Sequence, residues 1–156
     1  MYLLDTNHCS RIIENDAQVI QQLEDRREQG FATSVIACGE LLFMAWNSER
    51  RDANLGRVKA FLTGIRIYLV DGAIADAYGE LKAGLIRRLG PREKIKRRKI
   101  RIEEWGIRDN DLWMAAIALR HRLTVVSSDR DFERIRVVKP FPLETWWTSG
   151  EGKTGL

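Results

Sequence analysis

Four acidic residues of this chain lie in surroundings that accommodate a negative charge poorly. Asp5 and Asp129 lie at the ends of short apolar runs. Glu40 is the only charged residue of an apolar helical stretch, and Asp111 precedes eight uncharged residues. Burial of an unpaired carboxylate is strongly unfavourable, and the apolar stretches around Glu40 and Asp111 supply no lysine or arginine as a partner. Each of these acids must therefore be half-exposed, neutralised or paired.

If these carboxylates converge, a hard divalent cation is their natural partner. Clustered carboxylates repel one another unless a cation lies between them, and Mg²⁺ or Mn²⁺ prefers oxygen ligands and accepts a few carboxylates together with water. Such an ion can activate water and stabilise the charge that develops on a phosphodiester under attack. The residue types therefore predict a hydrolase that acts on nucleic acid.

Most of these acids also have a purely structural explanation. Asp5 could cap a helix that begins near residue 8, and Asp111 could be a first-turn acid favoured by the helix dipole. Asp129 and the neighbouring Asp131 could be turn residues, which we favour for Asp131. Neither capping nor turn formation explains Glu40, which lies inside its helix. It is the convergence of all four acids that favours a metal site.

The elements that must position these acids alternate between strand and helix. We expect strands at residues 2–4, 31–34, 65–70 and 123–127, with a further short strand at Val137–Val138. We expect helices from Asn15 or Asp16 to Gly30, over 36–46, 55–62 and 74–85, and from Asn110 or Asp111 to His121. This alternation predicts an α/β fold with a parallel sheet covered on both faces. Sites in such folds collect at the carboxyl ends of the strands.

Length and composition predict one globular domain. The 156 residues are 44% hydrophobic and 31% charged, as in globular rather than disordered proteins. We expect a single domain over residues 1–147, a flexible tail over 148–156, no membrane span and no secretory signal. The two cysteines, Cys9 and Cys38, are too few for a disulfide framework, and we expect both to be reduced in a cytoplasmic protein.

The charge of the chain is unevenly distributed. Residues 87–101, hereafter the basic segment, hold nine lysines and arginines and one acid. This segment carries a net charge of +8, whereas the whole chain carries +4, so the remaining residues carry −4. Such a segment suits a phosphate backbone, because neutralised phosphates supply most sequence-independent affinity for nucleic acid.

The four acids occur within motifs that resemble those of the PIN-domain family, specifically the VapC-type toxin ribonucleases of bacterial toxin–antitoxin pairs. The run Leu4-Asp5-Thr6-Asn7 is similar to the first acidic motif of the family, and Thr33-Ser34-Val35-Ile36 with Gly39-Glu40-Leu41 is similar to the second. Asn110-Asp111-Leu112-Trp113-Met114-Ala115-Ala116 resembles the third motif, and residues 125–132 resemble the last. The four motifs occur in the family's order and cover about residues 2–138.

The resemblance implies a PIN-like α/β/α sandwich with a central parallel sheet. It further implies an endoribonuclease that uses Mg²⁺, or Mn²⁺, to cleave single-stranded RNA, is neutralised by a cognate antitoxin, and forms a homodimer. Carried over by position, the metal-binding and catalytic acids are Asp5, Glu40, Asp111 and Asp129. The polar residues that would orient them or a water are Thr6, Asn7, Ser127 and Asp131.

The chain departs from the family pattern through an insertion at about residues 89–108, which contains most of the basic segment. One interpretation is an RNA clamp, in which Trp105 is a stacking platform. The others are a solvated, partly helical hairpin, or a surface for an acidic partner such as the antitoxin or a neighbouring subunit. The residues that would bind RNA are Lys94, Lys96, Arg97, Arg98, Lys99, Arg101 and Trp105.

Two other functions remain open. The first is a non-catalytic RNA-binding or scaffold protein on the same fold, whose working surface is the basic segment. The second is a phosphohydrolase that uses Asp5 as a nucleophile, although Asn7 occupies the position where such an enzyme needs a second aspartate. A Gly-rich phosphate loop is missing, which excludes an NTPase. His8 follows the first motif and could reach the site, but two histidines form no zinc pattern, and we favour a place on a helix surface for it.

Overall fold

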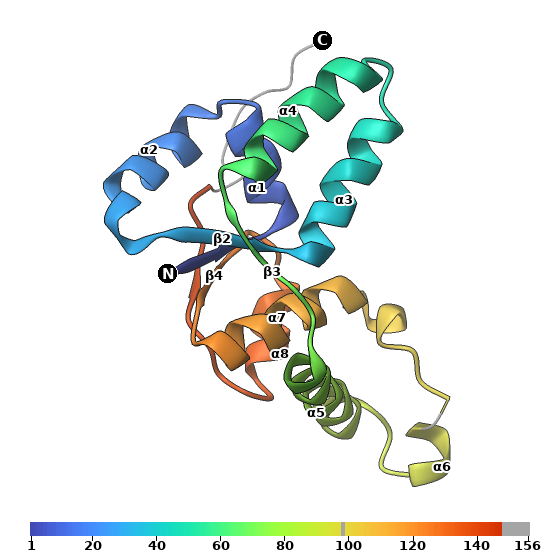
Figure 1. The fold of residues 1–156 in the computed structure, drawn as a ribbon. Helices are drawn as coiled ribbons and strands as arrows, with labels where there is room; N and C mark the ends of the chain where they lie inside the picture. The colour runs from blue at the N-terminus through green and yellow to red at the C-terminus, as the bar shows by residue number, and fades with distance from the viewer. Residues whose placement is uncertain (98, 148–156) are drawn as a thin grey trace, which may run out of the picture.

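A five-stranded parallel sheet forms the centre of the molecule. The computed structural model describes residues 1–97 and 99–147 (Figure 1). The strands lie in the order β3-β2-β1-β4-β5, and every neighbouring pair is parallel. The predicted α/β/α fold with a central parallel sheet is therefore confirmed. The strands are β1 (Tyr2–Leu4), β2 (Phe31–Ser34), β3 (Arg66–Tyr68), β4 (Thr124–Val126) and β5 (Leu143–Glu144).

Helices cover both faces of the sheet, because successive strand side chains point to opposite faces. Leu3 and Val125 belong to one hydrophobic cluster, whereas Leu4 and Val126 belong to the other. Figure 1 shows α1 to α4 on one side and α5, α7 and α8 on the other. The helices are α1 (Thr6–Ile13), α2 (Ala17–Asp25), α3 (Val35–Trp46), α4 (Arg51–Thr63), α5 (Gly72–Leu89), α6 (Lys94–Arg97), α7 (Asp109–His121) and α8 (Asp131–Arg136), with 3₁₀ turns η1 (Arg27–Gln29) and η2 (Ile102–Trp105).

Side-chain caps set where several helices begin. Asp16, Ser34 and Asp71 each accept a hydrogen bond from a first-turn backbone N–H of α2, α3 and α5, which satisfies donors that lack a partner inside the helix. None of the helices within residues 1–97 and 99–147 combines the length and apolar character required to cross a membrane.

The expected strand at Val137–Val138 is wrong. Helix α8 ends at Arg136, and Val137 is its C-cap, with a right-handed helical backbone conformation. The fifth strand lies further along the chain at Leu143–Glu144, paired with β4. Two adjacent β-branched residues favour a strand locally, but here Val138 packs against the core from a turn, so tertiary packing overrides the local preference.

The basic segment lies at the far end of α5. Figure 1 shows α6 beyond the end of this helix, at the edge of the molecule. The chain returns to the body at η2, where Ile102 is fully buried in the core. Arg98, the side chain of Lys94 and the predicted tail at 148–156 lie outside the described part of the structure.

Candidate active site

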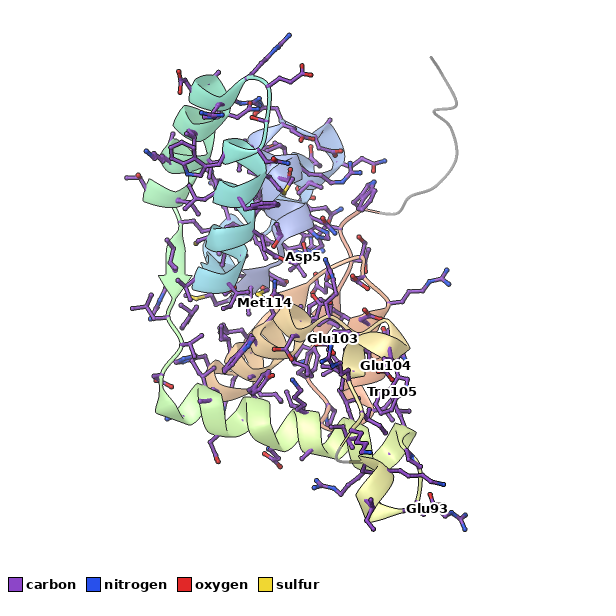
Figure 2. All side chains as sticks on the ribbon, turned by 90° about the vertical axis from the view of Figure 1, so that its right-hand side faces the viewer. Asp5, Glu93, Glu103, Glu104, Trp105 and Met114 are labelled. Carbon is purple, nitrogen blue, oxygen red and sulfur yellow. The ribbon has the colours of Figure 1, made fainter. Side chains whose placement is uncertain are left out.

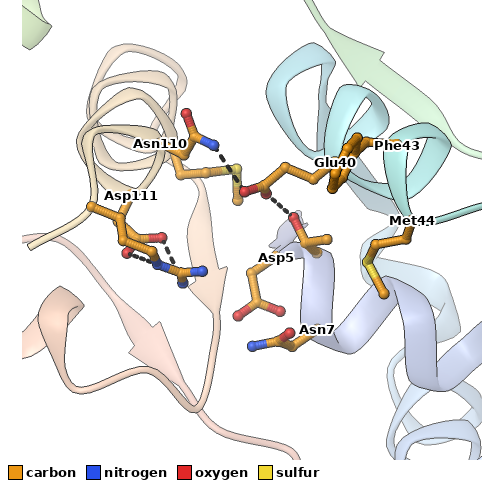
Figure 3. Close-up of a pocket in the computed structure, with 10 residues that line it drawn as sticks. Asp5, Asn7, Glu40, Phe43, Met44, Asn110 and Asp111 are labelled. Atoms are coloured by element: carbon orange, nitrogen blue, oxygen red, sulfur yellow. Dashed lines mark hydrogen bonds and ion pairs between the residues drawn. The ribbon is translucent and has the colours of Figure 1, made fainter. Parts of the chain in front are cut away.

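A pocket of about 190 Å³ opens where β1 and β2 end and α3 and α7 begin. Figure 3 shows three of the predicted acids facing it from three separate elements: Asp5 after β1, Glu40 on α3 and Asp111 on α7. The convergence predicted from their positions at strand ends and helix starts is thus observed for these three. The pocket is lined by Asp5, Thr6, Asn7, Glu40, Phe43, Met44, Arg108, Asn110, Asp111 and Met114.

Asp5 is buried and held by three hydrogen bonds. Its Oδ1 atom accepts from the backbone N–H of His8 at 2.7 Å and lies 2.8 Å from the Nδ1 atom of the same histidine, while Oδ2 accepts from the Ser127 hydroxyl. Asp5 therefore caps α1 as well as lining the pocket, so its structural and chemical explanations are compatible. The contact with Ser127 agrees with the orienting role predicted for that residue.

The expectation that His8 lies on a helix surface is wrong. The side chain is fully buried between Asp5 and the ring of Trp146, whose centroid is 6.3 Å from that of the imidazole. Its Nε2 atom has no hydrogen-bond partner in the described part of the chain. Because α1 begins directly after β1, its third residue points back toward the sheet.

Glu40 is half-buried, and both of its carboxylate oxygens are bound. The Thr6 hydroxyl donates to Oε2, and the Asn110 side-chain amide donates to Oε1 at 2.8 Å, as Figure 3 shows for Asn110. These bonds link α3 to α1 and α7. Thr6 therefore contacts one of the acids that it is predicted to orient, and Asn110 contacts the same acid although the sequence analysis gave it no role. The side chain of Asn7 lines the same pocket from an exposed position.

A second group of acids adjoins the pocket. Asp111, Asp129 and Asp131 each offer a carboxylate oxygen, and these oxygens all lie within 4.8 Å of one another. The loop after β4 is ordered by the Ser127 hydroxyl, which accepts from the backbone N–H of Asp129 at 3.0 Å. Asp129 in turn accepts from the backbone N–H of Asp131 at 3.0 Å. Asp131 belongs to this group, but it is the first residue of α8, so the turn position favoured for it is wrong. Its supporting role stays a prediction.

Arg108, like Asn110, is a residue of the site that the sequence analysis missed. Its guanidinium binds both oxygens of Asp111, at 3.1 and 3.3 Å, and Oδ2 of Asp129 at 2.7 Å. The expectation that no basic residue near Asp111 could pair with it is therefore wrong. Arg108 lies just before α7, three residues from Asp111, so a search of the apolar helix alone does not find it.

Burial and crowding shift the ionisation of this group. Burial raises the pKa of Asp111 to about 7, with Arg108 opposing the shift and Asp129 adding to it. Burial and the neighbouring Asp129 also raise the pKa of Asp131. For Arg108, burial acts to lower the pKa, but the attraction of Asp111 and Asp129 outweighs it and the pKa rises. The negative charge of the group is thus only partly compensated by Arg108.

The predicted RNA-binding residues fall into two structural classes. Lys96, Lys99 and Arg101 are exposed, whereas Arg97 donates to the backbone carbonyls of the loop before α6. Trp105 is half-buried and packs against the core, and its carbonyl accepts from Arg134. Figure 2 shows Trp105 between the pocket residue Asp5 and the distant α6. RNA binding by these residues stays a prediction.

The donor set of the site fits a hard divalent cation. The candidate ligands are carboxylate oxygens alone, Asp5 and Asp111 are 6% and 5% exposed, and three of the carboxylates already approach one another. A cationic guanidinium lies between two of them, which shows that this position favours a positive charge.

A family model described as "PIN domain" matches residues 2–138. This chain belongs to the PIN-domain family. The family predicted from the four acidic motifs is thereby confirmed. Two curated relatives carry the name "tRNA(fMet)-specific endonuclease VapC". The relative from Salmonella typhimurium is 26% identical over 146 residues, covering 93% of this chain and 97% of that protein. The relative from Shigella flexneri is 24% identical over 135 residues, covering 86% and 91%.

Two solved structures share this fold over nearly the whole chain. VapBC2 from Rickettsia felis, bound to a DNA fragment from its promoter, superposes with a TM-score of 0.72 and 26% identity, covering 93% of this chain and 98% of that one. DNA-bound VapBC from Salmonella typhimurium gives a TM-score of 0.73 and 25% identity, covering 94% and 98%. These likenesses agree with the VapC type that the sequence motifs resemble.

Proposed function

We propose that this PIN-domain protein is a Mg²⁺-dependent endoribonuclease, the toxin of a toxin–antitoxin pair. The observation that carries the proposal is the meeting of Asp5, Glu40 and Asp111 in one pocket at the carboxyl end of a parallel sheet. Both curated relatives described above are named as RNA endonucleases, which supports the same reaction.

The residues that would hold Mg²⁺, or Mn²⁺, are Asp5, Glu40, Asp111 and Asp129, with Asp131 close enough to share the role of Asp129. When bound, the ion would supply an activated water for attack on the scissile phosphate and would stabilise the charge on the leaving 3′ oxygen.

The chain itself supplies the rigid positioning that the reaction requires. Ser127 and His8 fix the carboxylate of Asp5, and Thr6 and Asn110 fix that of Glu40. Groups held in this way lose little entropy when the substrate binds. Exposed Asn7 lies at the edge of the pocket, where its amide can contact a phosphate or base of the entering strand.

The proposal includes a protein partner and a cellular location. Both solved relatives described above are VapBC toxin–antitoxin assemblies, and we infer that this chain is likewise neutralised by a cognate antitoxin. We also propose that the protein acts in the cytoplasm, where its RNA substrate is found. We further propose that it forms a homodimer and that each chain has one domain, over residues 1–147. Both cysteines are free and buried, in agreement with a reducing compartment.

The proposal is tested by incubating the purified chain with a single-stranded RNA in Mg²⁺ and in excess EDTA. We expect cleavage only with Mg²⁺, leaving a 3′-hydroxyl and a 5′-phosphate. Equal cleavage in EDTA would refute the metal-dependent mechanism.

The same experiment distinguishes the alternative of a non-catalytic RNA-binding protein on this fold, which the exposed part of the basic segment favours. That alternative predicts binding that needs no divalent ion and intact RNA under both conditions.

A further inference from the structure

Arg108 occupies an unusual position for a basic residue of a nuclease pocket. It lies in the short link between η2 and α7 and binds one acid on α7, Asp111, and one in the loop after β4, Asp129. Among the described residues, Arg108 forms ion pairs with Asp111 and Asp129, and 53% of its side chain is exposed to solvent. Part of the guanidinium edge therefore binds carboxylates, while about half of the side chain is accessible to solvent.

The guanidinium and a divalent cation require the same oxygens. Both carboxylate oxygens of Asp111 accept from Arg108, and so does Oδ2 of Asp129. A Mg²⁺ ion binds carboxylate oxygens at about 2.1 Å and leaves no space for N–H donors on the same lone pairs. Occupation by both cations would also place two like charges in contact in a poorly solvated site. The two cations therefore compete for Asp111 and Asp129, and binding of the divalent ion weakens the hold of Arg108 on these acids.

We propose that Arg108 is an exchangeable internal counter-ion: it holds Asp111 and Asp129 together in the metal-free chain, is displaced by the divalent cation, and then binds a phosphate of the substrate. This inference rests on the proposed metal-dependent nuclease function. It assigns Arg108 a role of its own in loading the site, beyond the acids.

The surroundings of Arg108 permit such a displacement. Its backbone is extended just before α7, and Gly106, two residues earlier, has a φ of 76°, a conformation that glycine adopts without strain. A displaced side chain can turn into solvent at the mouth of the pocket, because Arg108 itself lines that pocket. A planar guanidinium binds two phosphate oxygens at once, so its charge is transferred from the acids to the substrate.

The metal step is tested by titrating Mn²⁺ into EDTA-treated protein, with free Mn²⁺ measured by electron paramagnetic resonance. We expect Arg108→Ala to bind Mn²⁺ roughly 3- to 30-fold more tightly than the original chain, because a half-exposed pair of this kind contributes a modest free energy. Arg108→Lys keeps the charge but loses the two-pronged geometry, and its affinity should lie between the two.

Arg130→Ala is the matched control. Arg130 is exposed and adjacent to Asp129, and the ion pairs found in residues 1–97 and 99–147 do not include it. Its substitution removes the same charge near the site, and we expect a change of less than about twofold, because solvent screens an exposed charge. Equal affinities for Arg108→Ala and the original chain, or the same gain in Arg130→Ala, would overturn the exchange.

Thermal unfolding separates exchange from a merely structural role. Without metal, Arg108→Ala should melt at a lower temperature, since Asp111 and Asp129 then repel one another. Saturating Mn²⁺ should raise its Tm by more than it raises that of the original chain, because the tighter site gains more from ligand binding. An equal loss of Tm with and without Mn²⁺ would show that Arg108 only stabilises the fold.

The phosphate step is tested at saturating Mn²⁺ with a single-stranded RNA oligonucleotide. Arg108→Ala should raise KM about tenfold with a smaller change in kcat, the loss expected for one charge-assisted phosphate contact. An unchanged KM would overturn the phosphate contact. Failure of the original chain to bind Mn²⁺ at all would refute the proposed metal site, whereas equal Mn²⁺ binding by both proteins would refute the role of Arg108 alone.

Discussion

The acid pocket and the basic segment represent two different uses of charge in one small protein. In the pocket, Asp5 is buried and Glu40 is half-buried, and each is held by donors from other elements, as Ser127 holds Asp5 and Asn110 holds Glu40. In the basic segment, charges such as Lys96 and Lys99 are exposed, and α6 has only four residues.

This difference teaches which functions each region can perform. Catalysis needs atoms fixed to within a fraction of an ångström, and only the pocket provides such restraint. Attraction of a flexible polyanion needs charge density rather than geometry, and the basic segment provides that. Substitutions in the two regions should therefore affect turnover and affinity separately.

The largest effect is expected for Asp5→Asn. It should lower the rate of RNA cleavage by about 10³-fold or more, since it removes a charged ligand from a preorganised site. The amide still accepts a hydrogen bond from the backbone N–H of His8, so α1 stays capped. Circular dichroism and cleavage assays measure the two effects independently.

Asp71→Asn is the control for this change. Asp71 caps α5 by accepting from Ile74 at 2.8 Å and does not line the pocket. The Asp71→Asn variant should retain the full rate of RNA cleavage. Equal losses in the two variants would mean that Asp5 acts through the fold alone.

A smaller loss is expected for Asn110→Ala. The substitution frees one oxygen of Glu40 from its 2.8 Å hydrogen bond without removing an acid. Residues that orient metal ligands typically contribute about 10- to 100-fold to activity or metal affinity. Single-turnover cleavage at saturating RNA should show this loss in rate, and an unchanged rate would show that Glu40 needs no orientation from α7.

Neutralising the basic segment should reduce affinity rather than turnover. In the variant with Lys96, Lys99 and Arg101 changed to Gln, we expect about tenfold weaker RNA binding and a salt dependence shallower by roughly 0.7 for each lost phosphate contact. Fluorescence anisotropy at several salt concentrations measures both quantities.

The matched control replaces three exposed basic residues on another face, Arg50, Arg51 and Lys59. It should bind RNA almost normally. If the two triple variants bind equally well, the basic segment has no special role in RNA binding, which leaves the solvated hairpin and the surface for an acidic partner as its interpretations. If the basic-segment variant loses all function, and if the function of the original chain needs no metal, the RNA-binding alternative is favoured instead.

The smallest effect concerns stability. The pKa of Asp111 rises from 3.8 to about 7 on folding, so between these pH values the folded state holds a proton that the unfolded state has lost. Metal-free stability therefore falls as the pH rises through this window and stays lower above it. Asp111→Asn should remove most of this dependence, and the smaller part that comes from the raised pKa of Asp131 should remain.

At pH 8 the Tm of the metal-free Asp111→Asn variant should be roughly 3–8 °C higher than that of the original chain. At pH 4 the two should melt at similar temperatures. A higher Tm for the original chain at pH 8 would show that pairing of Asp111 with Arg108 outweighs its burial.

The sequence alone predicted most of the sheet and the acids, because both follow from local patterns. Residues 2–4, 31–34 and 124–126 are short apolar or β-branched runs, and an acid after such a run lies at the carboxyl end of the sheet. Strand β5 could not be predicted, since two residues carry no periodicity.

The errors arose where the outcome depends on three-dimensional packing. The burial of His8 depends on the angle at which α1 leaves β1, which no residue pattern reveals. Arg108 pairs with Asp129, which lies 21 positions away in the sequence. It is only three positions from Asp111, but its role in the site follows only from the structure, which brings both acids together. Asn110 was recognised within a motif, but its bond to Glu40 links segments 70 residues apart.

The central claim is that the buried acids act by holding a divalent cation. It is tested most directly by titrating Mn²⁺ into EDTA-treated protein and measuring bound Mn²⁺ and RNA cleavage in the same samples. We predict saturable binding, with a cleavage rate that rises in proportion to occupancy and is absent without metal. Cleavage at full rate in the metal-free protein, or a rate that does not follow bound Mn²⁺, would contradict the account.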